Sequence, residues 1–371
     1  MNAMLDHILQ VRERVLAGTP ITFEEAERLL ETPTEYLPYL TAAANEVRLR
    51  FAGDKVETCA LTNAKSGNCS EDCSFCSQSG HYKSDSPAYN LISVDEMVAQ
   101  AKAAEASGAT EFCIVTSGWG QTNPAEFDRI VEAVRRISQE CSIMIDASLG
   151  FMTPEQVQRL KEAGLYRNNH NLEACESFFE KVCKTHTYGE RFDHVTMVQE
   201  YGIHPCSGGI LGMGETPRQR LELAFALRDL NADCVPINIL NPRPGTPFAH
   251  LAPVEPLEAI KTIAIFRLIL PKSTIKIAGG REVNLRDLQA MALNAGANGL
   301  ILGNYLTTMG RNPERDIQML KDLGFDVQSH CEVAEGDRRP QPAGCGTPHG
   351  ALTAPESQAA AESCGSSSCH C

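Results

Sequence analysis

The chain has 371 residues, a net charge of −14 and fifteen cysteines. Hydrophobic residues make up 43% and charged residues 22%, which is ordinary globular composition and argues against a disordered or fibrous protein. No run of about 18 apolar residues occurs, and the first residues are too charged for a secretory signal, so we expect a cytoplasmic protein that does not span a membrane. The acidic balance, without a basic stripe, disfavours nucleic acid as a partner. Because disulfides are rare in the cytoplasm, so many cysteines indicate metal or redox chemistry.

From about residue 56, short β-branched apolar runs alternate with longer amphipathic segments, a pattern typical of repeated strand–helix units. We predict eight strands, over residues 56–62, 111–116, 143–147, 165–167, 203–206, 234–239, 274–278 and 299–302. Helices are expected near residues 94–106, 125–139, 155–163, 175–182, 190–200, 217–230, 256–270, 284–294 and 314–323. Ser93 with Glu96, and Thr153 with Gln156, fit capping boxes at two of the helix starts.

Eight strand–helix units in about 270 residues predict an α/β fold, a closed (β/α)8 TIM barrel. The alternative is an open doubly wound sheet, which is disfavoured because no Gly-x-Gly-x-x-Gly follows the first strand. We expect residues 1–50 to form a helical extension and residues 51–325 to form the barrel. Residues 326–371 would form a C-terminal segment with a tail rich in Gly, Pro and Ser, which holds Cys345, Cys364, Cys369 and Cys371.

Three cysteines, Cys69, Cys73 and Cys76, follow the first predicted strand at the spacing C-x3-C-x2-C. Thiolates this close in one loop can converge on a single iron–sulfur cluster. Three protein ligands on a four-iron cluster leave one iron open to a substrate. A structural zinc site, which would want a fourth ligand, and unliganded thiols are the alternatives that the spacing leaves open.

The loop resembles that of the radical S-adenosylmethionine enzymes, and the strings around it resemble the biotin synthase family. The matching strings, in order along the chain, are NAKSGNCSEDCSFCSQS, EFCIVTSGWG, NHNLE, THTYGERFD, PCSGGILGMGET, VPINIL, GTP, AGGREVN and YLTTMGRNP. They run from Asn63 to the region of Phe325, about 70% of the chain, and exclude the tail.

The resemblance implies the following reaction. A 4Fe-4S cluster on Cys69, Cys73 and Cys76 binds S-adenosylmethionine and cleaves it to a 5′-deoxyadenosyl radical. The radical abstracts hydrogen from dethiobiotin, and a sacrificial auxiliary cluster, usually 2Fe-2S, donates the sulfur that closes the ring of biotin. A flavodoxin or ferredoxin as electron donor, and a homodimer, are also implied.

The resemblance also assigns site residues. It implies that Cys113, Cys206 and Arg281 bind the auxiliary cluster. These three residues and the three cysteines of the loop are the implied catalytic and metal-binding residues. The S-adenosylmethionine contacts that it implies are Phe75, Asn171, Glu173, Arg191, Gly208, Gly209 and Ile210. The implied dethiobiotin contacts are Asn169 and Asn238 for the ureido ring and Thr307 and Thr308 for the carboxylate.

The chain departs from the family at Asp146, where the familiar biotin synthase carries a third auxiliary cysteine. A carboxylate can ligate iron but is a harder ligand than a thiolate, which puts the usual 2Fe-2S cluster in question; a larger variant follows if the tail supplies a ligand. Our hypothesis is that Cys364, Cys369 and Cys371 supply the missing thiolate, with Cys141 or Cys175 in reserve; exposed tail thiols are the alternative. Cys59, Cys141, Cys175, Cys183, Cys234 and Cys331 are otherwise interpreted as core or surface residues.

Three other functions stay open at this point. One is a related radical enzyme, of the hydrogenase-maturation or mutase type, which would share the barrel and the loop but not the dethiobiotin contacts. Another is a non-catalytic iron–sulfur protein, which would not need Asn169, Glu173, Arg191 or Asn238. The third is a zinc-stabilised binding module.

Overall fold

A computed structural model describes residues 3–327. Cys331 and the four tail cysteines, Cys345, Cys364, Cys369 and Cys371, lie outside the described residues, so the tail hypothesis stays a prediction. Within residues 3–327, no helix is both long enough and apolar enough to cross a membrane.

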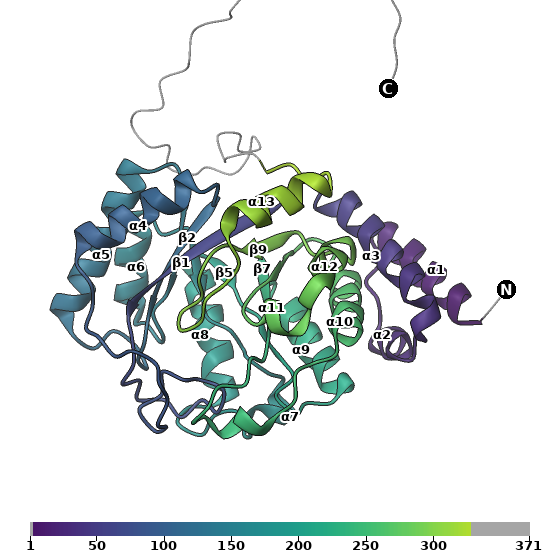
Figure 1. Ribbon diagram of the computed structural model, residues 1–371, viewed down its shortest axis with the longest axis horizontal. Helices are drawn as coiled ribbons and strands as arrows, with labels where there is room; N and C mark the ends of the chain where they lie inside the picture. The colour runs from purple at the N-terminus through teal and green to yellow at the C-terminus, as the bar shows by residue number, and fades with distance from the viewer. Residues whose placement is uncertain (1–2, 328–371) are drawn as a thin grey trace, which may run out of the picture.

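The described residues form a closed parallel barrel surrounded by helices, which confirms the predicted fold class (Figure 1). The strands are β1 (Glu57–Lys65), β2 (Glu111–Thr116), β3 (Met144–Ser148), β4 (Arg167–Asn169), β5 (His204–Cys206), β6 (Gly209–Leu211), β7 (Cys234–Ile239), β8 (Thr274–Ile277) and β9 (Gly299–Ile301). Their order is β5-β4-β3-β2-β1-β9-β8-β7-β6, and a pairing of β5 with β7 closes the ring. Strands β5 and β6 are consecutive and both pair with β7, so together they occupy one strand position of the barrel. The nine strands of the described residues therefore fill eight positions, and all eight predicted strands are present.

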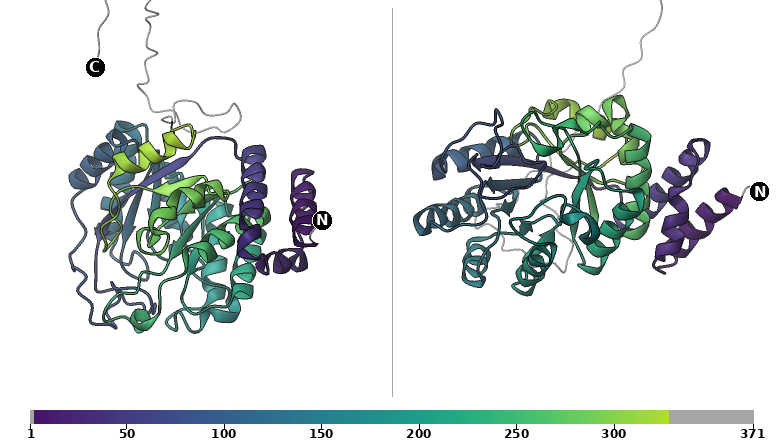
Figure 2. Two further views of the ribbon diagram at one scale, coloured as in Figure 1. Left: turned by 45° about the vertical axis from the view of Figure 1, so that its right-hand side comes forward. Right: turned by 90° about the horizontal axis from the view of Figure 1, so that it is seen from below.

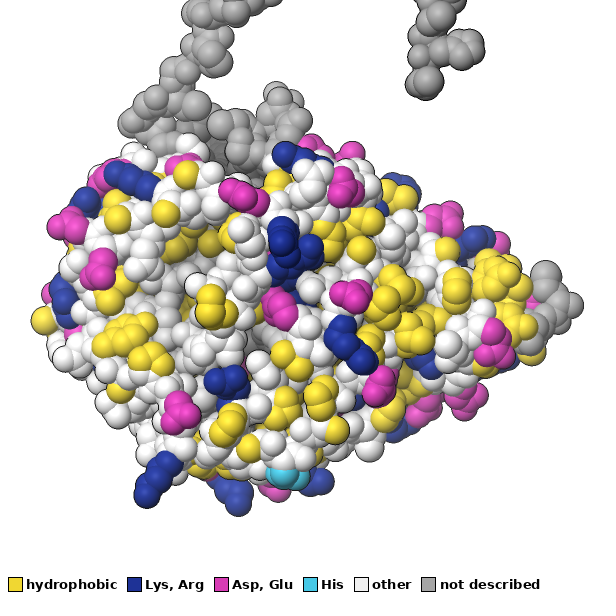
Figure 3. Space-filling view, viewed as in Figure 1, with side chains coloured by type: hydrophobic (Ala, Val, Ile, Leu, Met, Phe, Trp, Pro, Cys, Tyr) yellow, Lys and Arg dark blue, Asp and Glu magenta, His cyan; other side chains and the backbone are white. Residues whose placement is uncertain are grey.

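Helices pack outside the sheet, and the first three helices stand to one side of the ring (Figure 2). The helices are α1 (Ala3–Leu16), α2 (Phe23–Leu30), α3 (Leu37–Phe51), α4 (Val94–Ala106), α5 (Pro124–Glu140), α6 (Pro154–Ala163), α7 (Glu176–Phe179), α8 (Tyr188–Glu200), α9 (Pro217–Asp229), α10 (Pro256–Ile269), α11 (Arg281–Asn284), α12 (Gln289–Asn294) and α13 (Pro313–Asp322). Helix α3 lies along α10, which attaches the N-terminal helices to the barrel. On the face shown in Figure 3, acidic and basic side chains are intermixed, and apolar side chains gather over the first helices.

Capping chemistry in the sequence sets the helix starts. The two predicted capping boxes, at Ser93 and Thr153, are present, and Thr22, Thr187 and Thr216 make three more. Each box satisfies two backbone N–H groups that the first helical turn leaves without partners, which is why these helices begin where the pattern indicates.

Two predicted helices were wrong in extent. The segment near residues 175–182 contains only the short α7, because the Val182 carbonyl accepts a hydrogen bond from Ser74 N at 2.8 Å and so follows the cysteine loop. The segment near residues 284–294 is divided into α11, a 3-10 turn at Arg286–Leu288 and α12. Arg286 has a φ of +52°, which no continuous right-handed helix can contain.

The floor of the barrel, at the start of the strands, holds a buried ion network centred on Glu111. Arg167 Nη1 donates to Glu111 Oε1 at 2.5 Å and to Glu57 Oε2 at 3.1 Å. Lys276 Nζ donates to the other oxygen, Oε2, of Glu111. These two cations hold the pKa of Glu111 well below its usual value despite the burial of the carboxylate. Glu111 therefore compensates two cations in a space that excludes water.

We expect Glu111→Ala to lower the free energy of unfolding by about 3–5 kcal/mol, because it leaves Arg167 and Lys276 buried without their shared counterion. Chemical denaturation monitored by circular dichroism measures the loss. Glu132→Ala is the matched control, since Glu132 pairs with Arg135 on an exposed helix face, where about 0.5 kcal/mol is expected. Equal losses in the two variants would contradict this account of the barrel floor.

Candidate functional site

The three-cysteine loop leaves the carboxyl end of β1 and closes on itself through backbone hydrogen bonds. Cys69 N donates to Gln78 O at 3.0 Å, and Gly80 N donates to Cys69 O at 2.7 Å. A further bond, from Cys76 N to Cys73 O at 2.9 Å, turns the chain between the second and third cysteines. The loop is thus a tight ring at the mouth of the barrel, where catalytic groups of this fold gather.

The loop thiols are withdrawn from water. Burial raises the pKa of Cys76 to about 11, and the nearby charge of Cys69 adds to this shift. Burial also raises the pKa of Cys69, although Glu71 N–H and Gly118 N–H donate to its sulfur. Phe75 and Cys76 both pack against a buried group formed by Cys73, Phe179 and Cys183. Thiols with raised pKa values become thiolates readily only beside a cation, so this set is suited to a soft metal centre and not to free nucleophiles.

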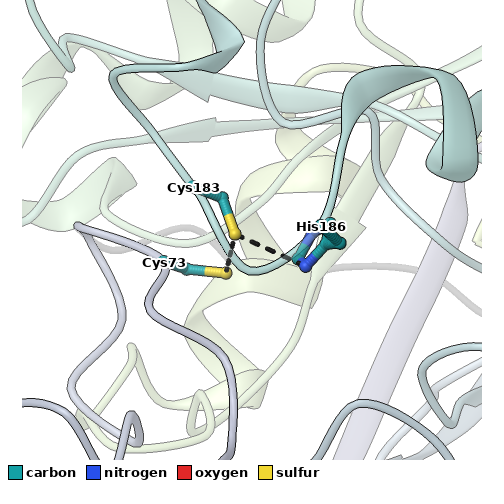
Figure 4. Close-up of side chains that lie close together, drawn as sticks. All are labelled: Cys73, Cys183 and His186. Atoms are coloured by element: carbon teal, nitrogen blue, oxygen red, sulfur yellow. Dashed lines mark hydrogen bonds between the residues drawn. The ribbon is translucent and has the colours of Figure 1, made fainter.

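A fourth thiol, which the sequence analysis did not single out, lies against this loop. Cys183 Sγ is 3.9 Å from Cys73 Sγ and 3.4 Å from His186 Nδ1 (Figure 4). The contact between the sulfurs raises the pKa of Cys73 and lowers that of Cys183 to about 4. Cys183 was predicted to be a core or surface residue, and it is buried; besides Cys73 and Phe179 it contacts the polar side chains of Asp72, Thr185 and His186. The sequence offered one signal for this site: His186, in the Thr-His-Thr string, is three residues after Cys183.

A polar cavity of about 170 Å³ opens beside the loop. Its polar lining includes Glu71, Asn169, Asn171, Glu173, His186 and Arg191, so four of the predicted binding residues share one space.

A relay of hydrogen bonds fixes the arginine of this cavity. Arg191 Nε donates to His186 Nε2 at 2.8 Å, and His186 Nδ1 lies 2.6 Å from Glu71 Oε2. Arg191 Nη1 donates to Asn171 O at 2.7 Å. The guanidinium is therefore held in one orientation, as the recognition of a carboxylate would require.

Glu173 reaches the cavity through an uncommon backbone conformation, with a φ of +66°. The strand behind it holds this conformation, since Glu173 N donates to Gly208 O at 3.0 Å and Ile210 N donates to Glu173 O at 2.9 Å. A Cβ on Gly208 would lie 2.0 Å from Pro236 O, and one on Gly209 would lie 2.6 Å from Glu173 O. The two glycines are required for the close approach of these backbones, whether or not a ligand also contacts them.

The predicted auxiliary ligands lie deeper, in the lumen of the barrel. Cys113 and Cys206 are both 2% exposed, and the sulfur of Cys113 accepts from Asn169 Nδ2 at 3.2 Å. Cys206 is the register partner of Cys234, and their thiols are hydrogen bonded to each other. Asp146 is the register partner of Cys113, and burial raises the pKa of its carboxyl group.

Arg281 is also buried, but its nitrogens are engaged. Nε donates to Tyr305 Oη at 3.0 Å, Nη2 donates to Asp316 Oδ2 at 2.5 Å, and Nη1 donates to Gln289. These acceptors raise the pKa of Arg281 against the effect of its burial. Arg281 is therefore a charged, fully partnered guanidinium in this structure.

The predicted substrate contacts lie around the same mouth. Asn238 Oδ1 accepts from Gly279 N at 3.0 Å, and Thr307 Oγ1 lies 3.1 Å from Ser77 Oγ of the cysteine loop. Thr308 is adjacent, and its carbonyl accepts from Tyr305 N at 2.9 Å. The loop, the cavity and the predicted substrate contacts thus occupy one end of the barrel.

The donor sets fit the two groups that the sequence predicted. The loop offers three buried or half-buried thiols in a closed ring, with polar cavity space beside them. The lumen offers thiols together with a buried carboxylate, Asp146, neither oxygen of which has a hydrogen-bond partner within residues 3–327. A buried carboxylate without partners is expensive, and a bound metal ion would compensate it.

Two family models match the chain: the Radical SAM superfamily over residues 64–227, and the Biotin and Thiamin Synthesis associated domain over residues 236–326. The biotin synthase of Geotalea daltonii is 48% identical over 320 residues, covering 86% of this chain and 97% of that protein. The biotin synthase of Carboxydothermus hydrogenoformans is 44% identical over 325 residues, covering 87% of this chain and 100% of that protein.

Among solved structures, methylornithine synthase (PylB) matches with a TM-score of 0.73 and 20% identity, covering 85% of this chain and 96% of that one. The hydrogenase maturase HydG of Carboxydothermus hydrogenoformans matches with a TM-score of 0.73 and 20% identity, covering 86% and 79%. At this identity the likeness shows a shared fold alone.

The hydrogen bond from Arg191 to His186 predicts that His186 orients the guanidinium of Arg191. We expect His186→Ala to weaken S-adenosylmethionine binding about tenfold or more, because Arg191 loses an acceptor that orients it. Anaerobic equilibrium dialysis measures the affinity, and iron content should stay that of the parent. His204→Ala is the control, since His204 begins β5 at the opposite end of the barrel. An unchanged affinity in His186→Ala would refute this role.

Proposed function

The chain belongs to the biotin synthase family of radical S-adenosylmethionine enzymes, and from that premise we propose how its residues divide the insertion of sulfur into dethiobiotin. When bound, the 4Fe-4S cluster supplies the electron that cleaves S-adenosylmethionine to a 5′-deoxyadenosyl radical, and the auxiliary cluster supplies the sulfur. Everything else in the reaction is binding, orientation and exclusion of water, which the protein provides.

Cys69, Cys73 and Cys76 would hold the four-iron cluster, with Phe75 packed against the buried group that contains Cys73. The closed ring of the loop supports this assignment, because its backbone hydrogen bonds hold the three cysteines within one short loop at the mouth of the barrel. A small molecule bound in the polar cavity would lie beside this loop, because Glu71 of the loop lines the cavity.

Residues of the polar cavity would bind S-adenosylmethionine. We assign Arg191 to the methionyl carboxylate, since the relay through His186 holds its guanidinium in place. Glu173 would accept hydrogen bonds from the ribose hydroxyls. Asn171 Nδ2 donates to Glu173 Oε2 at 3.4 Å, which orients this carboxylate. The backbone of Gly208, Gly209 and Ile210 would contact the ligand beside Glu173.

The observation that carries the proposal is the position of Asn169. This residue lines the polar cavity and also donates to Cys113 Sγ in the lumen at 3.2 Å. A substrate held by Asn169 would therefore lie between the site that generates the radical and the site that holds sulfur. Asn238 would bind the other edge of the ureido ring, and Thr307 and Thr308 the carboxylate.

Cys113 and Cys206 are the proposed auxiliary ligands; Arg281, which the resemblance adds to them, would have to give up a proton and one of its present acceptors to bind iron. The cluster is 2Fe-2S or a larger variant. Because Asp146 replaces a family cysteine, one thiolate would come from another part of the chain, and Cys364, Cys369 and Cys371 are candidates from the tail. We also propose a cytoplasmic homodimer, reduced by flavodoxin or ferredoxin, in which residues 1–50, 51–325 and 326–371 are separate segments.

The direct test is anaerobic incubation of the reconstituted protein with dithionite, S-adenosylmethionine and dethiobiotin. We expect both 5′-deoxyadenosine and biotin, measured by liquid chromatography and mass spectrometry. Deoxyadenosine without any sulfur-containing product would refute sulfur insertion and favour a related radical enzyme. Absence of deoxyadenosine from protein with a full complement of iron would refute the radical mechanism.

Asn238 gives a test of the substrate site. We expect Asn238→Ala to lower kcat/KM for dethiobiotin about tenfold or more, because the cyclic urea loses a hydrogen-bonding partner in a buried site. The affinity for S-adenosylmethionine should stay within about twofold of the parent. A loss of S-adenosylmethionine binding with an unchanged KM for dethiobiotin would place Asn238 in the other site.

A further inference from the structure

Cys59 lies in the barrel lumen, among the metal-binding groups that the family assigns to other positions. It is on β1 and only 3% exposed, and it packs against Cys113. Its sulfur, a carboxylate oxygen of Asp146 and a carboxylate oxygen of Glu111 all lie within 4.8 Å of one another. Cys59 was predicted to be a core or surface residue, and the structure places it beside Asp146, the residue that departs from the family.

The strand register explains this proximity. Cys59 on β1 is paired with Glu111 on β2, and Asp146 on β3 is paired with Cys113 on β2. Glu111 and Cys113 are two positions apart, so both point to the same face of β2. Cys59 and Asp146 therefore approach the lumen side of β2 from its two neighbouring strands.

Only one of the two carboxylates near Cys59 is compensated. Both oxygens of Glu111 accept from cations: Oε1 from Arg167 at 2.5 Å and Oε2 from Lys276. Neither oxygen of Asp146 has a hydrogen-bond partner in the part of the chain that the structure describes. The position between Cys59 and Asp146 thus combines a soft ligand with a hard ligand whose two oxygens have no hydrogen-bond partner among the described residues, which are conditions that favour an iron ion.

Arg281 does not offer an equivalent donor. Its nitrogens donate to Tyr305, Gln289, Asp316 and Ile301 O, and Asp316 is itself fully buried. A guanidinium binds a metal only after it loses a proton, and these acceptors favour the protonated form. A thiol already in the lumen requires no such exchange.

We propose that Cys59 is a ligand of the auxiliary iron–sulfur cluster in this chain, where it supplies from β1 the thiolate that Asp146 displaced from β3. The inference rests on the proposed function, because it takes from the family that the lumen holds an auxiliary cluster. Cys113 and Cys206 provide the other thiolates, and Asp146 is a neighbouring oxygen ligand. The tail cysteines are then dispensable for holding the auxiliary cluster.

The test isolates the auxiliary cluster by replacing Cys69, Cys73 and Cys76 together with Ala. This parent, reconstituted anaerobically with 57Fe and sulfide, is compared with versions that also carry Cys59→Ala, Cys141→Ala, or the three changes Cys364→Ser, Cys369→Ser and Cys371→Ser. Cys141, which was held in reserve as a ligand, is the matched control, since the structure places it as a buried cysteine at the end of α5, outside the barrel. Iron content, acid-labile sulfide and the Mössbauer spectrum are the readouts, and circular dichroism checks the fold.

We expect Cys59→Ala to lose most of the auxiliary iron and to change the spectrum of the remainder, while Cys141→Ala and the tail variant match the parent. Asp146→Cys, added to Cys59→Ala, should restore the iron by returning the family's thiolate. Should Cys59→Ala fail to fold, Cys59→Ser keeps the size of the side chain and should still shift the Mössbauer parameters. Unchanged iron and spectrum in Cys59→Ala, or loss confined to the tail variant, would overturn the proposal.

These outcomes are separable from the proposed function. Iron in the lumen that depends on Cys59, in a chain whose unmodified form makes no biotin, would leave the ligand assignment standing and refute the function. If the chain forms biotin but its auxiliary iron content does not change when Cys59 is replaced, the function would stand and the ligand assignment would be refuted.

Discussion

The ion pairs of Glu111 with Arg167 and Lys276 are the interaction on which the interior of the barrel depends. A parallel barrel turns every second side chain of each strand inward, and in this chain many of those side chains are charged or carry sulfur. Glu111 accepts from both cations and so stabilises the floor. Glu111 engages both cations, whereas neither oxygen of Asp146 has a hydrogen-bond partner in the part of the chain that the structure describes, and this distinguishes the middle of the lumen from its floor.

Above this floor the molecule separates two kinds of chemistry by depth. The cysteine loop, the Arg191 relay and Glu173 lie at the mouth, where a small molecule can enter. The thiols of Cys59, Cys113 and Cys206 lie within the strands, buried from solvent. Asn169 contacts both levels, since it lines the cavity and donates to Cys113. This arrangement supports a reaction in which a radical formed at the mouth acts on a substrate whose new sulfur comes from below.

Much of the fold could be predicted from the sequence, because strand–helix alternation and capping boxes are local signals. All eight predicted strands are present, and the errors fell where a tertiary contact intervened, as at Val182, or where a residue takes a positive φ, as at Arg286. The three-cysteine loop was equally visible, since its members are close in sequence. Cys59 and Cys183 carried no such signal. Cys59 meets Glu111 and Asp146 only through sheet register, and Cys183 is 110 residues from Cys73. From the sequence alone, a single cysteine in a strand or loop is interpreted as a core residue, because its neighbours in space are known only from the fold.

The central claim is that the sulfur delivered to dethiobiotin resides in the lumen of the barrel. A single-turnover experiment tests it: the protein is reconstituted with 34S-sulfide, freed of unbound sulfide, and incubated with S-adenosylmethionine, dethiobiotin and reductant in natural-abundance buffer. Mass spectrometry should then find 34S in the biotin, with a matching loss of labelled sulfide from the auxiliary cluster. Biotin that carries only natural-abundance sulfur, formed while the labelled sulfide stays on the protein, would contradict the account.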